Sequence, residues 1–353
     1  MLLVYGILFG LLVLQGPLKK LNDPKRMFCI IAAGSLAFVS ACKAIWVNGD
    51  LISYSNAYAS LPFRSFSSLY NAWRAEELKD FGFYAVGKVF ADSGISAELW
   101  MAAIAVLFAA AFSWYVYQNS RQPWISVLML LTLFFSFTLS GLRQTMALAG
   151  VFYAYECIKK QDLKRFLIAV LIAYMFHSSA LIFLPAYWIA KLKINWKQPA
   201  MVIAAMVITL VFPDLIRELI ERLAWNDSLA GYAEHETAIS WAGFVIQLFI
   251  IGFCMLFRID SFLNNKDRQV EIDSYLNCMV IGLCFQCVSV VIAEAFRISY
   301  YYSICCVAAV PNVIMTNRSP RNRTIMIFGV CASLLAYMLW SGAYSTPTFF
   351  WQV

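Results

Sequence analysis

The chain has 353 residues, of which 62% are hydrophobic and only 13% are charged, and its mean hydropathy is +0.70. A typical soluble domain carries roughly 25% charged residues, so this composition excludes a chain whose whole surface faces water. The net charge of +7 lies mostly in short segments between apolar runs, where basic residues set membrane orientation, and does not indicate nucleic-acid binding. The sequence predicts an all-α polytopic membrane protein, a single transmembrane domain over residues 1–353 with about 10–12 transmembrane helices.

The first apolar run, 2–17, is followed by its positive charges and has neither a basic leading segment nor an A-x-A-like cleavage site. We therefore expect a retained first helix, with its N-terminus outside, and not a signal peptide. Further helices are expected at about 27–47 and 99–118. Between them lies a long outer loop, 48–98, of mixed charge.

The run from Ile125 to Ile158 is too long for one crossing. As one helix it would span about 51 Å, against a bilayer core of about 30 Å. The chain is expected to fold back at Ser140-Gly141, which places Arg143 at an outer turn.

The stretch from Phe166 to Ala190 has the length of one helix, but one crossing would put every later basic loop outside. A short hairpin turning at His177 keeps those loops inside, with legs of about 18 Å each. His177 would then lie part-way into the membrane, where polar groups need protein burial or a water-filled cavity.

The remaining chain alternates in the same way. The expected elements are a helix at about 199–213, an outer loop at 214–240, a helix at about 241–257, an inner loop at 258–273, a run at 274–317 that folds back near Ala295, and a last helix at about 324–341.

Three ionisable side chains thus lie at outer turns: Arg143, His177 and Arg297. Ionisable groups within the membrane are costly and mark candidate functional sites. Two interpretations stay open, because the arginines would also serve as interfacial anchors or ion-pair partners, and His177 as a hydrogen-bonded buried histidine.

Other polar residues also allow both a structural and a functional interpretation. Glu294 and Arg297 are three residues apart and would pair on one helix. Tyr301 belongs to a run of three tyrosines typical of an interfacial belt or of a sugar groove. His235, between two glutamates in the outer loop, suits a solvated segment, a metal ligand or a second base. The sequence has no HExxH motif, phosphate-binding glycine loop or D-x-D pair, so no metal or other cofactor is predicted.

Several segments together resemble the EpsG family of Wzy-like polysaccharide polymerases, over about residues 48–315. They are Gly141-Leu142-Arg143-Gln144, Ala173-Tyr-Met-Phe-His177-Ser-Ser-Ala-Leu-Ile, Gly49-Asp50 with Tyr54 and Tyr58, Asp80-Phe-Gly-Phe83, and Arg297-Ile-Ser-Tyr300-Tyr301. One departure is visible, because the glutamate expected directly before Gly-Phe is absent. Asp80 is the nearest acid, and we give it no site role at this point.

The resemblance implies a GT-C-like membrane glycosyltransferase in the bacterial cytoplasmic (inner) membrane, with its active site facing the periplasm or outside. Such enzymes transfer a growing glycan from undecaprenyl pyrophosphate to the next lipid-linked repeat unit, without a nucleotide sugar. The expected partners are the lipid-linked oligosaccharide, membrane lipid and a co-polymerase that regulates chain length.

The chemistry of this transfer suggests roles for the candidates. A pyrophosphate leaving group needs charge stabilisation, which arginines provide through bidentate contacts, so Arg143 and Arg297 are expected there. His177 has a suitable ordinary pKa for the general base, with His235 as the alternative. The residues expected to orient sugars or the base are Asp50, Tyr54, Gln144, Glu294 and Tyr301.

Two other functions share these features. A lipid-linked oligosaccharide flippase or transporter would also need arginines that face a cavity, and an O-antigen ligase-like enzyme would use the same donor with a different acceptor. Polymer formation by the purified chain separates the polymerase from both.

Overall fold

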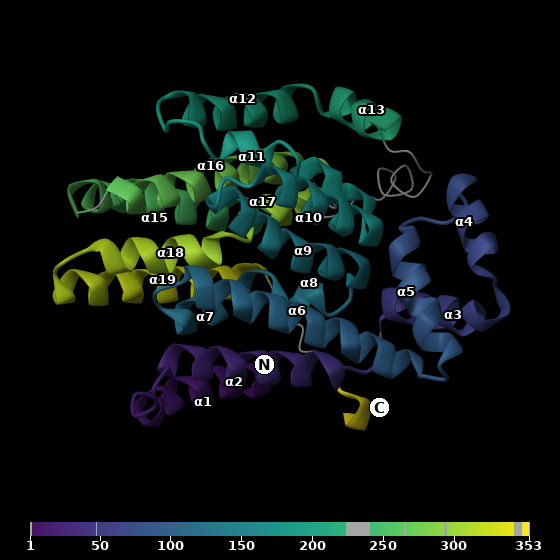
Figure 1. The fold of residues 1–353 in the computed structure, drawn as a ribbon. Helices are drawn as coiled ribbons and strands as arrows, with labels where there is room; N and C mark the ends of the chain where they lie inside the picture. Colours follow the sequence, from purple (N-terminus) through teal and green to yellow (C-terminus); the bar gives the residue numbers. More distant parts are fainter. Residues whose placement is uncertain are drawn as a thin grey trace. The chain divides into compact units, whose positions relative to one another are not determined.

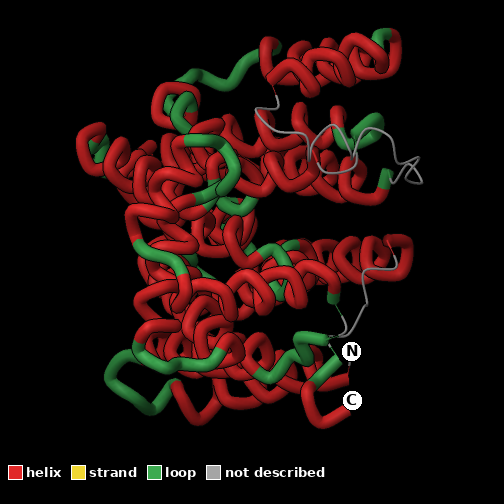
Figure 2. The backbone as a smooth tube through the Cα atoms, turned by 90° about the vertical axis from the view of Figure 1, so that its right-hand side faces the viewer, coloured by secondary structure: helices red, strands yellow, loops and turns green. Residues whose placement is uncertain are grey.

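The computed structural model describes residues 2–46, 48–223, 241–264, 266–292, 295–341 and 348–352. Over these residues the chain is helical, as the ribbon (Figure 1) and the tube coloured by secondary structure (Figure 2) show. The β pairing found there is an isolated bridge between Lys43 and Phe349. The prediction of an all-α polytopic membrane protein is confirmed.

Three described helices are long and apolar enough to cross a bilayer: α2 (Pro24–Ala41), α6 (Ala97–Asn119) and α19 (Pro320–Ser341). The pair α17 (Ala295–Ser303) and α18 (Cys306–Thr316) would add a fourth span, bent by 42°. Several shorter apolar helices accompany them. The full number of crossings and the single transmembrane domain stay predictions.

The described chain divides into two compact units, the first built from residues 1–184 and 344–353 and the second from 185–343. The other helices of the first unit are α1 (Leu2–Leu18), α3 (Gly49–Ser60), η1 (Leu61–Phe63), α4 (Phe66–Arg74), α5 (Phe81–Asp92), α7 (Pro123–Leu133), α8 (Phe135–Thr138), α9 (Leu142–Lys159), α10 (Leu163–Phe176), η2 (Ser178–Phe183) and η3 (Phe350–Gln352). The second unit also holds α11 (Ala186–Ile189), α12 (Lys197–Val211), α13 (Pro213–Leu223), α15 (Ala242–Asn264) and α16 (Lys266–Val288).

Short polar side chains start many of these helices. Asn48 accepts hydrogen bonds from the first amides of α3, Ser65 caps α4, Ser96 caps α6 and Asp162 caps α10. Each satisfies an amide that would otherwise lack a partner within the helix, which fixes where the helix begins.

The helices are interrupted at the breaks predicted from chain length and from the distribution of basic residues. The run at 125–158 is interrupted between α8 and α9, around Ser140 and Gly141, and there is an earlier break at Phe134. Helix α10 ends at Phe176, and His177 is extended, with φ −158°. The run at 274–317 is interrupted between Val288 and the start of α17.

Other boundaries differ from the prediction. The helix expected at 27–47 ends at Ala41. The next residues leave the helix and pair with the C-terminal segment, where the backbone N–H of Ala44 donates a hydrogen bond to the carbonyl of Thr348. The expected outer loop at 48–98 contains α3, η1, α4 and α5, and the expected inner loop at 258–273 is mostly helical. In the outer loop at 214–240, α13 occupies the start, and His235 lies outside the described residues.

An apolar core in the first unit joins the elements that carry the predicted site. It gathers buried side chains of α3, α5, α6 and α9, among them Leu51, Phe83, Trp100 and Met146. Because these helices share one core, the residues at their ends are held in fixed positions relative to one another.

Candidate active site

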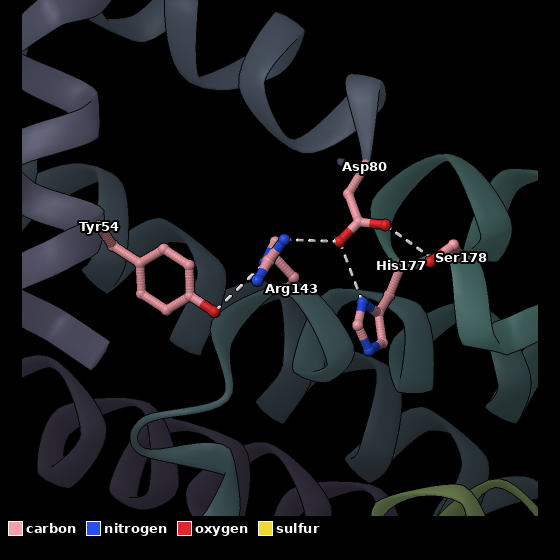
Figure 3. Close-up of polar contacts among 5 residues, drawn as sticks. All are labelled: Tyr54, Asp80, Arg143, His177 and Ser178. Carbon is pink, nitrogen blue, oxygen red and sulfur yellow. Dashed lines mark hydrogen bonds and ion pairs between the residues drawn. The ribbon is translucent and has the colours of Figure 1, made fainter. Parts of the chain in front are cut away.

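Asp80 is the centre of a polar cluster in the first unit (Figure 3). It precedes α5 in a left-handed conformation, with φ 58° and ψ 57°, which aspartate tolerates better than most residues. Although it occupies the N-cap position, its side chain makes no capping hydrogen bond to α5. Its two oxygens bind groups from other helices instead.

Arg143 contacts Asp80 from the first turn of α9. Its Nη1 lies 2.9 Å from Oδ2 of Asp80, and its Nε donates to the hydroxyl of Tyr54 at 3.3 Å. The guanidinium also lies 5.7 Å from the centroid of the Tyr54 ring. Three elements distant in sequence are thereby joined through one arginine.

His177 reaches the same carboxylate from the end of α10. Its Nδ1 lies 3.0 Å from Oδ2 of Asp80, and the backbone N–H of Ser178 donates to Oδ1 at 2.7 Å. The extended backbone at His177 ends the helix and frees the next amide for this contact. Arg143 and His177 are therefore neighbours that share one oxygen atom.

Gly82 permits this arrangement. A Cβ atom built there would lie 2.7 Å from the backbone oxygen of Met175, closer than real side chains allow. A glycine thus lets the start of α5 approach the last turn of α10. That approach brings Asp80 within hydrogen-bonding distance of His177.

The carboxylate is enclosed, while its two side-chain partners are partly open. The Asp80 side chain is 1% exposed, against 25% for Arg143 and 24% for His177. Asp80 lies outside the candidate membrane-spanning helices, and burial by itself raises its pKa. The hydrogen bond from His177 and the charges of His177 and Arg143 outweigh burial, so the net pKa is lowered. Asp80 is an anion that fixes both partners.

This geometry suits proton transfer beside a phosphate-binding cation. When His177 donates its Nδ1 hydrogen to Asp80, its Nε2 carries the lone pair and is free to accept a proton. Arg143 uses Nη1 and Nε for Asp80 and Tyr54, and its partly exposed guanidinium retains donors for an anionic ligand.

The model of the EpsG family matches residues 26–352, nearly the whole chain. The chain belongs to the EpsG family. This is a family of Wzy-like polysaccharide polymerases, so the resemblance drawn from the sequence motifs is confirmed. A comparison with curated proteins found no match to the chain, and a comparison with solved structures found none either.

Besides Arg143 and His177, three predicted site residues of this EpsG-family chain lie on α3 and α9, the helices that carry Tyr54 and Arg143. Tyr54 contacts Arg143 directly. Asp50 lies one turn before Tyr54 on α3 and is exposed. Gln144 follows Arg143 in the first turn of α9 and is buried.

The other predicted residues belong to the second unit or lie outside the described residues. Arg297 is in α17 of the second unit, half-buried, with its guanidinium 6.0 Å from the centroid of the Phe296 ring. Tyr301, on the same helix, is buried. Glu294 lies outside the described residues. Their site roles stay predictions.

Sequence reasoning missed two members of the cluster, Asp80 and Tyr84. The motif Asp80-Phe-Gly-Phe83 could have identified Asp80. The family pattern has an acidic residue directly before Gly-Phe, and Asp80 is one position further away, so no role in the site was predicted for it from the sequence. Tyr84 lies one turn further along α5; burial raises its pKa, and the charge of nearby Arg143 opposes that shift. Neither position could be placed beside Arg143 from the sequence of a long connecting segment.

Lys43 was also missed. It is buried, and its Nζ donates to the carbonyl of Leu139 at 2.5 Å, in the break that precedes Arg143. A hydrogen bond from this buried side chain to the helix-end carbonyl fixes the path of that break. No cluster of three potential metal ligands occurs in the part of the chain that the structure describes.

Proposed function

We propose that this chain is a glycosyltransferase that polymerises polysaccharide repeat units on the outer face of the bacterial cytoplasmic membrane. It would transfer a growing glycan from undecaprenyl pyrophosphate to the next lipid-linked repeat unit, as in O-antigen or exopolysaccharide synthesis. The observation that carries the proposal is the shared contact of Arg143 and His177 with Asp80.

In the proposed reaction an acceptor hydroxyl attacks the anomeric carbon of the donor glycan. A new C–O bond forms, the bond from that carbon to the pyrophosphate oxygen breaks, and the lipid pyrophosphate leaves with the electron pair. Nε2 of His177 takes the hydroxyl proton, as general-base catalysis requires. Asp80 holds the imidazole in the competent tautomer and stabilises the imidazolium that forms.

Arg143 is proposed to stabilise the leaving group. Negative charge develops on the pyrophosphate as its bond to the sugar breaks, and a guanidinium remains charged throughout the reaction. Its contacts with Asp80 and Tyr54 hold it in one orientation, which reduces the reorganisation needed during the reaction.

The surrounding groups are proposed to bind sugar. Asp50 is exposed one turn from Tyr54, and Gln144 follows Arg143, so both flank the cluster on separate helices. Arg297 is proposed as a second phosphate-binding group, with Glu294 and Tyr301 as its sugar-binding neighbours in sequence. A chain-length-regulating co-polymerase is the proposed protein partner.

The test is polymerisation by purified protein reconstituted in lipid nanodiscs with lipid-linked repeat units. The wild-type chain should convert them into a ladder of polymers, and His177→Ala and Arg143→Ala should not. Arg165→Ala is a matched control, because Arg165 is an exposed arginine in the first turn of α10 that pairs with Asp162, the residue that caps this helix.

Two companion assays, one in closed vesicles and one with a lipid A core acceptor, distinguish the alternatives. A flippase would move lipid-linked repeats across a vesicle membrane without joining them, and a ligase would join glycan only to a lipid A core acceptor. Wild-type ladders from well-folded His177→Ala, Arg143→Ala and Arg297→Ala variants would remove the proposed site.

A further inference from the structure

An aromatic stripe runs along α4 in the first unit. Phe66, Tyr70 and Trp73 are spaced by four and three residues, so they share one side of the helix. Leu69 and Ala72 of the same helix are buried, and Leu69 is three residues after Phe66 and four before Trp73. The stripe therefore borders the core-facing side of α4.

The stripe is partly open. Phe66 is 47% exposed and Tyr70 45% exposed, and Trp73 is half-buried. Large exposed aromatic side chains gathered on one surface indicate a binding surface more often than scattered ones do.

One end of the stripe meets the candidate active site. The Phe81 ring lies 6.0 Å from the Tyr70 ring and 5.9 Å from the Trp73 ring, measured between centroids. Tyr70 and Trp73 are themselves 5.8 Å apart. Phe81 directly follows Asp80 in the chain and packs against the apolar core. The three rings thus form a continuous surface that begins beside the carboxylate shared by Arg143 and His177.

The other end is fixed by a paired cation. Nζ of Lys88 lies 5.5 Å from the centroid of the Phe66 ring. The same ammonium contacts Asp92 at 2.8 Å and donates to the carbonyl of Leu61 at 3.2 Å. Because both ends are tied to rigid elements, the stripe is a preorganised surface.

The chemistry around the stripe favours a carbohydrate. Asn71 and Arg74 are exposed on α4 beside Tyr70 and Trp73, so flat aromatic faces are bordered by hydrogen-bonding groups. Sugar rings need this combination, because their C–H faces are apolar and their edges carry hydroxyls. From Phe66 to Trp73 the helix rises about 10 Å, enough for more than one sugar ring.

We infer that the stripe Phe66–Tyr70–Trp73, continued by Phe81, binds the glycan of the lipid-linked substrate and guides it to the Asp80 cluster. This inference rests on the proposed function, because it assigns the stripe to that reaction's substrate. If the inference is correct, removing the aromatic rings of the stripe weakens substrate binding but leaves proton transfer to His177 intact.

The experiment is saturation-transfer NMR and calorimetric titration with the repeat-unit oligosaccharide released from the cell's own polymer. The protein is the full chain in nanodiscs, as wild type, as Tyr70→Ala/Trp73→Ala and as the control Tyr153→Ala/Trp114→Ala. The control removes a comparable exposed pair, since Tyr153 is 43% exposed and Trp114 37% exposed, with rings 6.0 Å apart.

The stripe variant, Tyr70→Ala/Trp73→Ala, should bind the oligosaccharide about tenfold more weakly than wild type. The control variant, Tyr153→Ala/Trp114→Ala, should bind it with the affinity of wild type. In the polymerisation assay the stripe variant should have a raised KM for lipid-linked repeats and an unchanged kcat. If the double variant does not fold, Tyr70→Ala and Trp73→Phe, which retain one or both rings, should show the same trend with smaller effects.

Equal oligosaccharide affinity for the stripe variant and wild type overturns the inference. Equal affinity with altered reconstitution into vesicles would make the stripe a lipid-contacting surface, which also overturns it. The two proposals fail separately: His177→Ala should bind the oligosaccharide normally without polymerising repeats. A wild-type chain that binds oligosaccharide through the stripe but forms no polymer contradicts the proposed function alone.

Discussion

The two units each contain a buried polar network, and the two networks differ in charge and in access. In the first unit, Asp80 joins Arg143 and His177, and both of these partners are about one quarter exposed. In the second unit the network is uncharged and connects α15, α16 and α17. Its members are Gln247, Gln286, Ser299 and Ser303.

The second network satisfies its groups internally. Gln247 donates to Gln286 and Ser299 at 3.3 Å and accepts from Ser303 at 3.0 Å. Ser303 also lies where a Cβ on Gly282 would clash, so α16 and α17 approach closely. Small residues and side-chain hydrogen bonds of this kind join helices within membranes. Under the proposed function, the charged and partly open cluster of the first unit carries the chemistry, and the neutral network of the second unit packs helices together.

Removing the base should give the largest effect. His177→Ala should lower kcat for polymerisation by about 10²–10⁴-fold, because the acceptor hydroxyl loses its proton acceptor. Ser299→Ala, in the second network, should leave kcat close to wild type. Single-turnover rates with lipid-linked repeats measure both, and equal losses in the two variants would erase the distinction between the networks.

Arg143→Lys tests whether a cation alone suffices. Lysine keeps the charge but cannot contact Asp80, Tyr54 and a phosphate through a planar fork, so activity should fall by about 10²–10³-fold. Arg165→Lys, at an exposed position, should be neutral. A fully active Arg143→Lys enzyme would show that Arg143 contributes only its positive charge and not its planar hydrogen-bonding geometry.

Asp80→Asn should destabilise the first unit, by about 3–5 kcal/mol, because Arg143 and the Ser178 amide lose a buried anion. The ordinary pKa of 3.8 is lowered in the folded chain, so this stabilisation is complete above about pH 5. It is lost as pH falls below about 4, through the folded-state pKa. Unfolding temperatures of wild type and Asp80→Asn in detergent should therefore converge only in acid. If the two unfolding temperatures already converge near pH 7, Asp80 is not the ionised partner of Arg143.

Gln286→Leu should give the smallest effect. Interhelical hydrogen bonds in membranes contribute about 0.6–2 kcal/mol, so the unfolding temperature should fall slightly. Activity per folded molecule should be unchanged, because the second network is proposed only to pack α17 against its neighbours. A large loss of kcat with normal stability would instead give this network a part in catalysis.

The sequence predicted the breaks in the helices better than the contacts between them. Length required a turn near Gly141, because the bilayer limits how far an apolar helix can extend, and the distribution of basic residues required the turn at His177. Asp80 and Tyr84 could not be placed, since they lie in a long connection whose helices have little apolar periodicity that points to a partner. The approach of α5 to α10 depends on Gly82, and nothing local in the sequence reveals that Met175 is its neighbour.

Arg143 and His177 could be predicted as site residues because of their positions at helix breaks. Both residues follow helix breaks, where the backbone no longer satisfies its own hydrogen bonds and a polar side chain acquires partners from elsewhere. Lys43 lies beyond the end of α2 in the same kind of position, but its partner, the Leu139 carbonyl, is a backbone group that no motif identifies.

The most direct test of the central claim is polymerisation by the purified chain in nanodiscs supplied only with lipid-linked repeat units. Wild type should produce a polymer ladder with release of lipid pyrophosphate, and Asp80→Asn protein whose folding at the assay pH is verified by its unfolding temperature should produce little or none. A wild-type rate from a folded Asp80→Asn enzyme would contradict the assignment of catalysis to the cluster of Asp80, Arg143 and His177.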